Sequence, residues 1–206
     1  RATLAGSARR RKDTIGDLDV VVAVDEADHE SVANAILNLP GIADVKGAGD
    51  SKISLILDTT IFDDSFTVGH IDANVLDAIG GDDYEQLEAG GTIDAQVRLV
   101  PRHVEPFTLA YFTGSKEHNI AMRQRAIDRG LRLNEFGLIP EAKAGELKGM
   151  EAAAYSLEAV DEAAIYAHLN LAYVPPELRE DMGEVQAAQD GTLPHLIETS
   201  HIKGAL

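Results

Sequence analysis

The sequence predicts an α+β protein. Three observations support this class: apolar β-branched runs alternate with amphipathic segments, glycine and proline stops separate them, and the order lacks a regular strand–helix–strand repeat. A length of 206 residues suits one domain or two small ones. A hydrophobic share of 45% with 26% charged residues is typical of a globular protein that buries a core.

The first half is predicted to contain most of the strands. Apolar, β-branched residues indicate strands over 18–24, 51–57 and 93–100. A helix is expected over 27–39, with Asp28 as its N-cap and Pro40-Gly41 as its stop. The acidic stretch 58–92 contains two Gly-Gly turns and is expected to be an excursion with some helix.

The second half is predicted to be mainly helical. Helices are expected over 106–112, 115–129 and 157–169, with a strand pair over 131–138 between the last two. Ser115 is the expected N-cap of the second helix, and Gly130 its C-terminal stop. From Tyr173 onward the proline-marked sequence predicts a loop-like tail.

Composition excludes several classes of protein. Without cysteine there are no disulfides, iron–sulfur clusters, thiolate zinc sites or thiol nucleophiles. No run of about 18 apolar residues is present, so no membrane partner is expected. The first residues lack the apolar stretch of a signal peptide, and a cytoplasmic location is therefore expected.

The formal net charge of −17 is unevenly distributed. Segment 1–12 carries +5 and segment 101–132 carries +3, whereas 13–100 carries −16 and 133–206 carries −9. Screening acts over about 8 Å at physiological salt, so a basic segment is expected to act largely independently of distant acid. The net charge therefore does not exclude a nucleic-acid partner.

Residues that suit phosphate and metal chemistry gather near the N-terminus. Gly6-Ser7 and the basic run 9–12 precede Gly16-Asp17-Leu18-Asp19, which enters an apolar strand. Carboxylates at i and i+2 of a strand share a face, and Mg²⁺ is typically held by one or two carboxylates with substrate phosphates. In an acidic chain, Asp-x-Asp alone more often marks solvated turn residues. The combined pattern predicts a nucleotide-binding, metal-dependent phosphoryl-transfer site.

Several segments, in order, resemble the family X DNA polymerases, of which DNA polymerase beta is the best-known member. GSARRRKDTIGDLDVVV resembles the nucleotidyltransferase motif of that family, YFTGSKEHN its deoxynucleotide-contacting segment, and RGLRLNEFGL its thumb segment. The end of the chain resembles the part of bacterial and archaeal members that leads into a PHP phosphoesterase domain. The resemblance implies a nucleotidyltransferase-type palm, a mixed sheet with flanking helices, followed by a small α+β thumb.

The resemblance also implies roles for individual residues. Asp17 and Asp19 would ligate catalytic Mg²⁺ or Mn²⁺, and Ser7 and Arg10 would bind phosphates in a cradle shaped by Gly6 and Gly16. The residues expected to contact the nucleotide sugar are Tyr111, Phe112 and Gly114, and Asn119 would contact the base. Arg123 would contact the template strand, and Arg98 and Glu135 would belong to networks that change on closure.

One position departs from the family pattern. Aligning Arg98 with the family's arginine places Gln96 where a third catalytic aspartate is expected. An amide cannot act as a base, and it lowers the negative charge of the site. Asp94 lies two residues earlier on the same strand face, and a slipped register or bulge would bring it into that place. We therefore expect a palm that binds a nucleotide–Mg²⁺ complex and transfers slowly or not at all.

The predicted organisation follows from the same resemblance. Residues 1–105 would form the palm, with the excursion 58–92, residues 106–172 the thumb, and 173–206 a tail toward a PHP domain. The family's lyase and fingers domains and the PHP domain are expected in a longer parent protein.

The expected function is transfer of a deoxynucleotide from a deoxynucleoside triphosphate to the primer 3′-OH of primer-template or gapped DNA, in repair. Such a protein would associate with the nucleoid when bound to DNA. Two alternatives stay open: an impaired nucleotide- or DNA-binding palm that positions a PHP nuclease, and a template-independent nucleotidyltransferase.

Some of these residues also have a purely structural interpretation. Arg123, Arg125, Arg129 and Arg132 would form either a DNA-facing set or a solvated helix face. Tyr111 and Phe112 would be ordinary core aromatics without the Thr-Gly-Ser that follows. The seven histidines show no zinc-ligand spacing and are expected at the surface or in packing.

Overall fold

The computed structural model describes residues 1–61, 91–144 and 149–197. Two compact units are present: Arg1–Ala8 with Asp13–Arg102, and Arg9–Lys12 with His103–Leu206. Both units combine strands and helices, and the predicted α+β class is confirmed. Most of the predicted excursion, residues 62–90, lies outside the described residues. The functional division at 105/106 and 172/173 stays a prediction.

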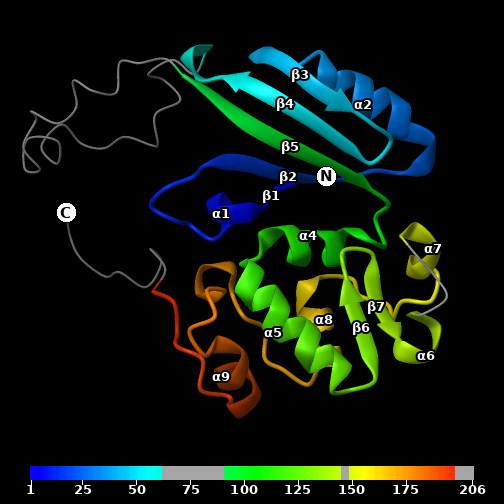
Figure 1. The fold of residues 1–206 in the computed structure, drawn as a ribbon, viewed down its shortest axis with the longest axis vertical. Coiled ribbons are helices and arrows are strands. Elements are labelled where there is room, and N and C mark those ends of the chain that lie inside the picture. Colours follow the sequence, from blue (N-terminus) through cyan, green and yellow to red (C-terminus); the bar gives the residue numbers. More distant parts are fainter. Residues whose placement is uncertain (62–90, 145–148, 198–206) are drawn as a thin grey trace, which may run out of the picture. The chain divides into compact units, whose positions relative to one another are not determined.

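The first unit is built on a five-stranded mixed sheet (Figure 1). Its strands, in the order β1-β2-β5-β4-β3, are β1 (Ala2–Leu4), β2 (Asp17–Ala23), β5 (Thr92–Val100), β4 (Lys52–Asp58) and β3 (Ile42–Ala48). The β2–β5 pair is parallel, and every other pair is antiparallel. The three predicted strands correspond to β2, β4 and β5. The edge strands β1 and β3 were not predicted, because one has three residues and the other is almost entirely exposed.

One face of this sheet forms the core of the first unit. Helix α2 (His29–Leu37) packs Val32, Ala33, Ile36 and Leu37 against a cluster of strand residues: Val22, Val24, Ile53, Leu55, Ala95, Val97 and Leu99. A short 3-10 turn, η1 (Glu26–Asp28), precedes α2, and a second, η2 (Thr59–Ile61), follows β4. Asp28 is the N-cap as predicted, but its side chain makes no capping hydrogen bond. Because strand side chains alternate, the opposite face presents Asp17 and Asp19 of β2 together with the buried Val21 and Ala23.

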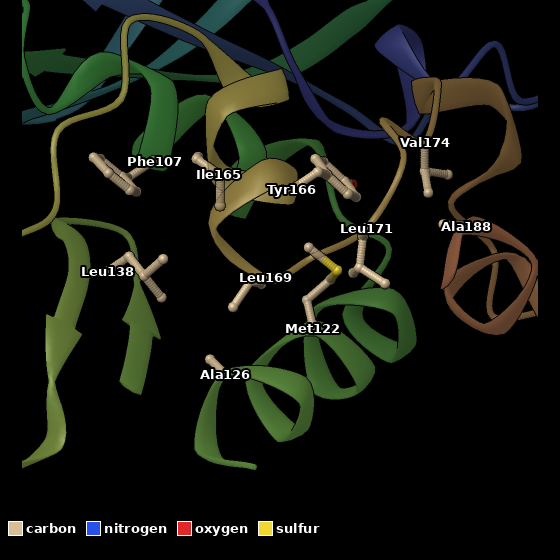
Figure 2. Close-up of a cluster of buried hydrophobic side chains, with 10 residues drawn as sticks. All are labelled: Phe107, Met122, Ala126, Leu138, Ile165, Tyr166, Leu169, Leu171, Val174 and Ala188. Atoms are coloured by element: carbon tan, nitrogen blue, oxygen red, sulfur yellow. The ribbon is translucent and has the colours of Figure 1, made fainter. Parts of the chain in front are cut away.

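The second unit packs helices around a small hairpin. Its elements are α4 (Glu105–Thr113), α5 (Lys116–Ile127), β6 (Leu131–Asn134), β7 (Gly137–Pro140), α6 (Glu141–Ala144), α7 (Met150–Ala153), α8 (Glu162–His168), η5 (Pro176–Leu178) and α9 (Glu184–Asp190). Figure 2 shows the buried cluster at its centre: Phe107, Met122, Ala126, Leu138, Ile165, Tyr166, Leu169, Leu171, Val174 and Ala188. Full burial of one large apolar side chain contributes about 1.5–3 kcal/mol, so this cluster is the main stabilising feature of the unit.

Helix capping explains where two of these helices begin. The Ser115 hydroxyl accepts a hydrogen bond from the backbone N–H of His118, which confirms the predicted N-cap of α5. Asp161 accepts from the N–H of Ala164, and α8 therefore begins at residue 162 rather than at 157. The predicted strand pair over 131–138 is confirmed as the β6–β7 hairpin, which extends to Pro140.

The prediction of a loop-like tail from Tyr173 was incomplete. This segment contains η5 and the helix α9, and it contributes Val174 and Ala188 to the core. Helix α9 has seven residues and a single large apolar side chain, Val185, so its periodicity gave little signal. None of the described helices is long and apolar enough to cross a membrane.

Candidate nucleotide and metal site

The candidate residues fall on both units. Those of the first unit are Gly6, Ser7, Gly16, Asp17, Asp19, Gln96 and Arg98. Those of the second unit are Arg10, Tyr111, Phe112, Gly114, Asn119, Arg123 and Glu135.

Asp17 and Asp19 project from one face of β2, opposite the side chains that pack against α2. The short helix α1 (Gly6–Arg9) begins beside this carboxylate pair. The backbone N–H of Ala5 donates to the carbonyl of Asp19 over 2.7 Å. A Cβ at Gly6 would lie 2.6 Å from Oδ2 of Asp19, and φ there is +62°. Glycine is therefore required at position 6, both for its backbone conformation and for this close approach.

Gln96 lies directly beside Asp19. In the parallel β2–β5 ladder, Gln96 pairs with Asp19 and Asp94 pairs with Asp17. Residues paired in this way share a sheet face and lie about 4.8 Å apart between strands. The neutral amide therefore occupies the place on β5 that pairs with the second aspartate. Its assignment to the family's third catalytic position stays a prediction.

Asp94 does not take the place of the missing carboxylate. The β2–β5 and β4–β5 ladders run without a register shift, and the bulges of this sheet lie in β3. Asp94 instead accepts a 2.6 Å hydrogen bond from the ammonium group of Lys46. The slipped register or bulge that would bring Asp94 to position 96 is thus absent from the β2–β5 and β4–β5 ladders. Within 1–61, 91–144 and 149–197, no group of three acidic or histidine side chains is arranged to hold a metal ion.

The residues present fit one hydrated divalent cation better than two. Mg²⁺ commonly uses one or two carboxylates and takes its other ligands from water and substrate phosphates. Asp17 and Asp19 supply such a pair, and the glycine at position 6 places no side chain against the second carboxylate. A second cation would need more negative charge than the neutral Gln96 supplies.

Arg98 also lies on this polar face of the sheet. It pairs with Val21 of β2 and with Lys52 of β4. Ser54, which pairs with Gln96, lies between β5 and the β3 edge. The face thus combines the acidic residues of β2 with basic residues on β4 and β5.

In the second unit, the predicted nucleotide-contacting residues lie at the junction of α4 and α5. Tyr111 and Phe112 pack edge to face, with ring centroids 5.2 Å apart. Nδ2 of Asn119 donates to the carbonyl of Tyr111 over 2.7 Å, and Nε of Arg123 donates to the carbonyl of Asn119. These bonds hold the polar side chains of α5 near the end of α4.

A pocket beside these residues is too small for a nucleotide. Its lining includes Tyr111, Asn119, Arg123 and Tyr166, and its volume is about 20 Å³. A volume of this size accommodates about one water molecule. Base binding near Asn119 would therefore take place outside this pocket.

The four arginines between residues 123 and 132 were expected to form either a DNA-facing set or a solvated helix face, and the structure shows two kinds of environment for them. Arg125 donates to the carbonyl of Leu169 and to Gln189, and Arg132 pairs with Glu141. These two have structural partners within the unit. Arg123 and Arg129 are exposed, and the hydrogen bond of Arg123 to Asn119 uses its Nε.

The basic run 9–12 is paired with acidic residues far away in the sequence. Arg10 bonds to Glu180, Arg11 pairs with Glu177, and Lys12 lies 3.6 Å from Glu180. The run therefore has acidic counter-ions within 4 Å, which a count of charge along the sequence does not reveal. Its partners follow it by about 165 to 170 residues but belong to the same unit.

Sequence reasoning missed a buried charge network in this unit. Glu162 accepts hydrogen bonds from Arg9 at 2.5 and 3.0 Å and from Arg179 at 2.6 Å. Burial opposes ionisation of Glu162, but the hydrogen bond from Arg9 and the charge of Arg179 outweigh it, so its pKa is lowered. Arg179 is fully buried, and its guanidinium group packs against the rings of Tyr166 and Tyr173. No local sequence signal indicates a buried arginine in a proline-rich tail.

A second buried pair lies beside this network. Nδ1 of His118 lies 2.5 Å from Glu184, and its Nε2 lies 2.9 Å from the Tyr166 hydroxyl. Burial lowers the pKa of His118 and raises that of Tyr166. These contacts fasten α9 to α5, which agrees with the expected packing role for this histidine.

Three comparisons with known proteins bear on this arrangement. The family described as "DNA polymerase beta thumb" matches residues 108–180. The "DNA polymerase/3'-5' exonuclease PolX" of Bacillus subtilis (strain 168) is 36% identical over 202 residues, which are 98% of this chain and 28% of that protein. A crystal structure of Leishmania infantum polymerase beta, described as a ternary gap complex, has a TM-score of 0.62 at 22% identity, over 87% of this chain and 62% of that one.

The chain thus resembles the family X DNA polymerases along nearly its whole length, as its motifs predicted. The structural likeness confirms the predicted fold, a palm-type mixed sheet followed by an α+β thumb. The chain spans 28% of the length of the curated relative.

Proposed function

We propose that this chain is the palm and thumb part of a DNA polymerase and that it binds a deoxynucleoside triphosphate with Mg²⁺ or Mn²⁺. The observation that carries this proposal is the half-buried Asp17–Asp19 pair on one face of β2, with the glycine backbone of residue 6 against the second carboxylate. The resemblance to family X supports the choice of a deoxynucleotide and of DNA as partners.

In this proposal, one group of residues binds the cation and the phosphates, and another group contacts the sugar and the base. Asp17 and Asp19 hold the cation, which neutralises triphosphate charge when bound. Ser7 and Arg10 bind phosphate oxygens, and Gly16 shapes the turn into β2. Tyr111, Phe112 and Gly114 line the sugar site, and Asn119 contacts the base.

The remaining predicted residues act on DNA. Arg123 contacts the template strand, and Arg98 and Glu135 take part in closure around a primer-template or gapped duplex. The lyase, fingers and PHP domains belong to a longer parent protein.

Gln96 limits the chemical step in this proposal. Transfer requires that the primer 3′-OH lose its proton, and a side chain acting as general base typically contributes about 10²–10⁴-fold. The amide at position 96 cannot accept that proton, and Asp94 is paired with Lys46 instead. Nucleotide binding is therefore efficient and primer extension slow.

A second candidate function is a palm that binds nucleotide without transferring it, as an accessory to a nuclease domain. The same pairing of Gln96 with Asp19 favours it. Nucleotide binding in calorimetry, with no extension of a gapped primer, would select this function. Extension without a template would select a template-independent nucleotidyltransferase.

Primer extension on gapped DNA with Mg²⁺ tests the proposal through Gln96→Asp. We expect slow extension by the parent chain, extension faster by at least tenfold in Gln96→Asp, and none in Asp19→Asn. Ser54→Asp is a matched control, because it adds a carboxylate to the same face one strand further from β2.

The control should leave the extension rate near that of the parent. Equal rates in the parent and in Gln96→Asp would show that position 96 does not limit transfer. Absence of any nucleotide binding by the parent would overturn the proposal as a whole.

A further inference from the structure

The guanidinium group of Arg10 is held within the second unit by Glu180, Thr113 and Gly114, and we call this arrangement the Arg10 seat. Its Nε donates to Oε1 of Glu180 over 2.8 Å, and its Nη1 donates to the carbonyl of Thr113 over 2.5 Å. Arg10 is only 13% exposed, whereas its neighbour Arg11 is 81% exposed. The side chain is therefore held in place at two points.

Gly114 forms the back of this seat. Its φ of +68° favours glycine, and a Cβ there would lie 3.2 Å from Nη1 of Arg10. A side chain at this position would press on the guanidinium group. The sequence assigned Gly114 to the sugar site, and the structure gives it a second role beside the arginine.

The two contacts of Arg10 use only part of its guanidinium group. Arginine has five N–H donors, and the two contacts use Nε–H and one N–H of Nη1. Nη2 makes no hydrogen bond to the residues that the structure describes. The Nη1–Nη2 edge is the fork that binds two phosphate oxygens.

We propose that Glu180, together with Thr113 and Gly114, positions Arg10 for a triphosphate. Glu180 is thus a positioning residue for nucleotide binding. This inference rests on the proposed function, because it takes Arg10 to be a phosphate ligand.

The alternative is that Glu180 competes with phosphate for Arg10. Two observations favour positioning. Glu180 engages Nε rather than the Nη1–Nη2 edge, and its other oxygen lies 3.6 Å from the ammonium group of Lys12. Its charge is thus offset by Lys12 without covering the edge that phosphate needs.

Calorimetric titration of the 206-residue chain with dATP and Mg²⁺ tests the inference. Freezing a long side chain on binding accounts for up to about tenfold in affinity. We therefore expect Glu180→Ala to raise Kd about tenfold. Glu180→Gln should stay within about threefold of the parent, because its amide oxygen still accepts from Nε.

A double-mutant cycle with Arg10→Ala separates positioning from a general structural effect. In the Arg10→Ala background, Glu180→Ala should change Kd no further, since the side chain to be positioned is absent. Glu177→Ala is the matched control, because Glu177 pairs with exposed Arg11 from the same segment. It should leave Kd unchanged.

Each other outcome overturns the inference. Tighter binding in both Glu180→Ala and Glu180→Gln would identify Glu180 as a competitor. An equal loss with and without Arg10 would identify a structural effect. If Glu180→Ala does not fold, Glu180→Asp tests the inference instead, because it shortens the side chain and keeps the charge. Positioning predicts several-fold weaker dATP binding in this variant. Binding as tight as that of the parent would contradict it.

The result for the parent chain separates the two proposals. Parent binding that Glu180 variants leave unaltered would overturn positioning alone. A parent chain that binds no dATP would overturn the proposed function, and the inference with it.

Discussion

Replacing Glu162 with glutamine should strongly destabilise the second unit. The carboxylate of Glu162 is the shared partner of Arg9 and Arg179, and the latter is fully buried. Glutamine is nearly isosteric, so the substitution removes the charge with little change in packing. It leaves a buried guanidinium group without its counter-charge.

The expected loss in the free energy of unfolding depends on the contacts that Arg179 retains in the variant. Removing one partner of a buried ion pair typically costs about 3–5 kcal/mol. Arg179 retains its bond to the carbonyl of Val174 and its contacts with Tyr166 and Tyr173, at 5.3 and 5.4 Å. We therefore expect a loss near the lower limit, about 3 kcal/mol, which is a large share of the 5–15 kcal/mol typical of a folded domain.

Urea unfolding followed by near-ultraviolet circular dichroism measures this loss. The chain has no tryptophan, so the signal reports tyrosines, of which Tyr166 and Tyr173 contact Arg179. Glu141→Gln is the matched control: it breaks an exposed pair with Arg132 in the same unit and should cost no more than about 0.5 kcal/mol. Equal losses in the two variants would refute the reasoning.

The stability difference between the parent and Glu162→Gln should also depend on pH, and the pKa of Glu162 determines the direction. Because folding lowers the pKa of Glu162, its contribution is present above the ordinary value of 4.5. That contribution is lost as the pH falls through the lower folded value. The stability difference between the parent and Glu162→Gln should therefore be constant near neutral pH and shrink in acid.

Two glycine substitutions test close approaches elsewhere. Gly6→Ala places a Cβ 2.6 Å from Asp19 at positive φ, and it should weaken Mn²⁺–dATP binding about tenfold or more. Gly47→Ala is its control, because a Cβ at that position of β3 meets nothing within 4 Å. Unchanged affinity in both variants would contradict the role of position 6. Gly137→Ala places a Cβ 2.5 Å from Oγ of Ser156, which accepts a hydrogen bond from the Leu138 N–H. This substitution should lower the free energy of unfolding, measured by urea titration, by about 1–3 kcal/mol. A loss within 0.5 kcal/mol would show that the hairpin relaxes.

Local patterns were sufficient to predict the strands β2, β4 and β5 of the first unit and the shared face of its two carboxylates. The apolar run of β2 predicts a buried strand, and the i, i+2 spacing alone places Asp17 and Asp19 on one face. Matching short motifs assigned Gln96 to the family's third catalytic position, and its pairing with Asp19 became apparent only from the strand register. The exposed edge strand β3 was missed because the prediction of strands relied on runs of apolar residues, which β3 lacks.

Contacts between distant residues could not be predicted in this way. The acid that offsets Arg10 is 170 residues away, so a count of charge along the chain assigned an open basic patch to a segment with its own counter-ions. Arg179 and Glu162 read as surface residues, since buried charge is rare and leaves no periodic signal. Position 114 showed its contact with Arg10 only once the fold was known.

A crystal structure of this chain grown with dATP and Mn²⁺, with the metal located by its anomalous scattering, tests the central claim most directly. The account predicts one Mn²⁺ held by Asp17, Asp19 and the triphosphate, and a second ion only in the Gln96→Asp variant. Two ions in the parent chain, or none beside Asp17 and Asp19, would contradict it.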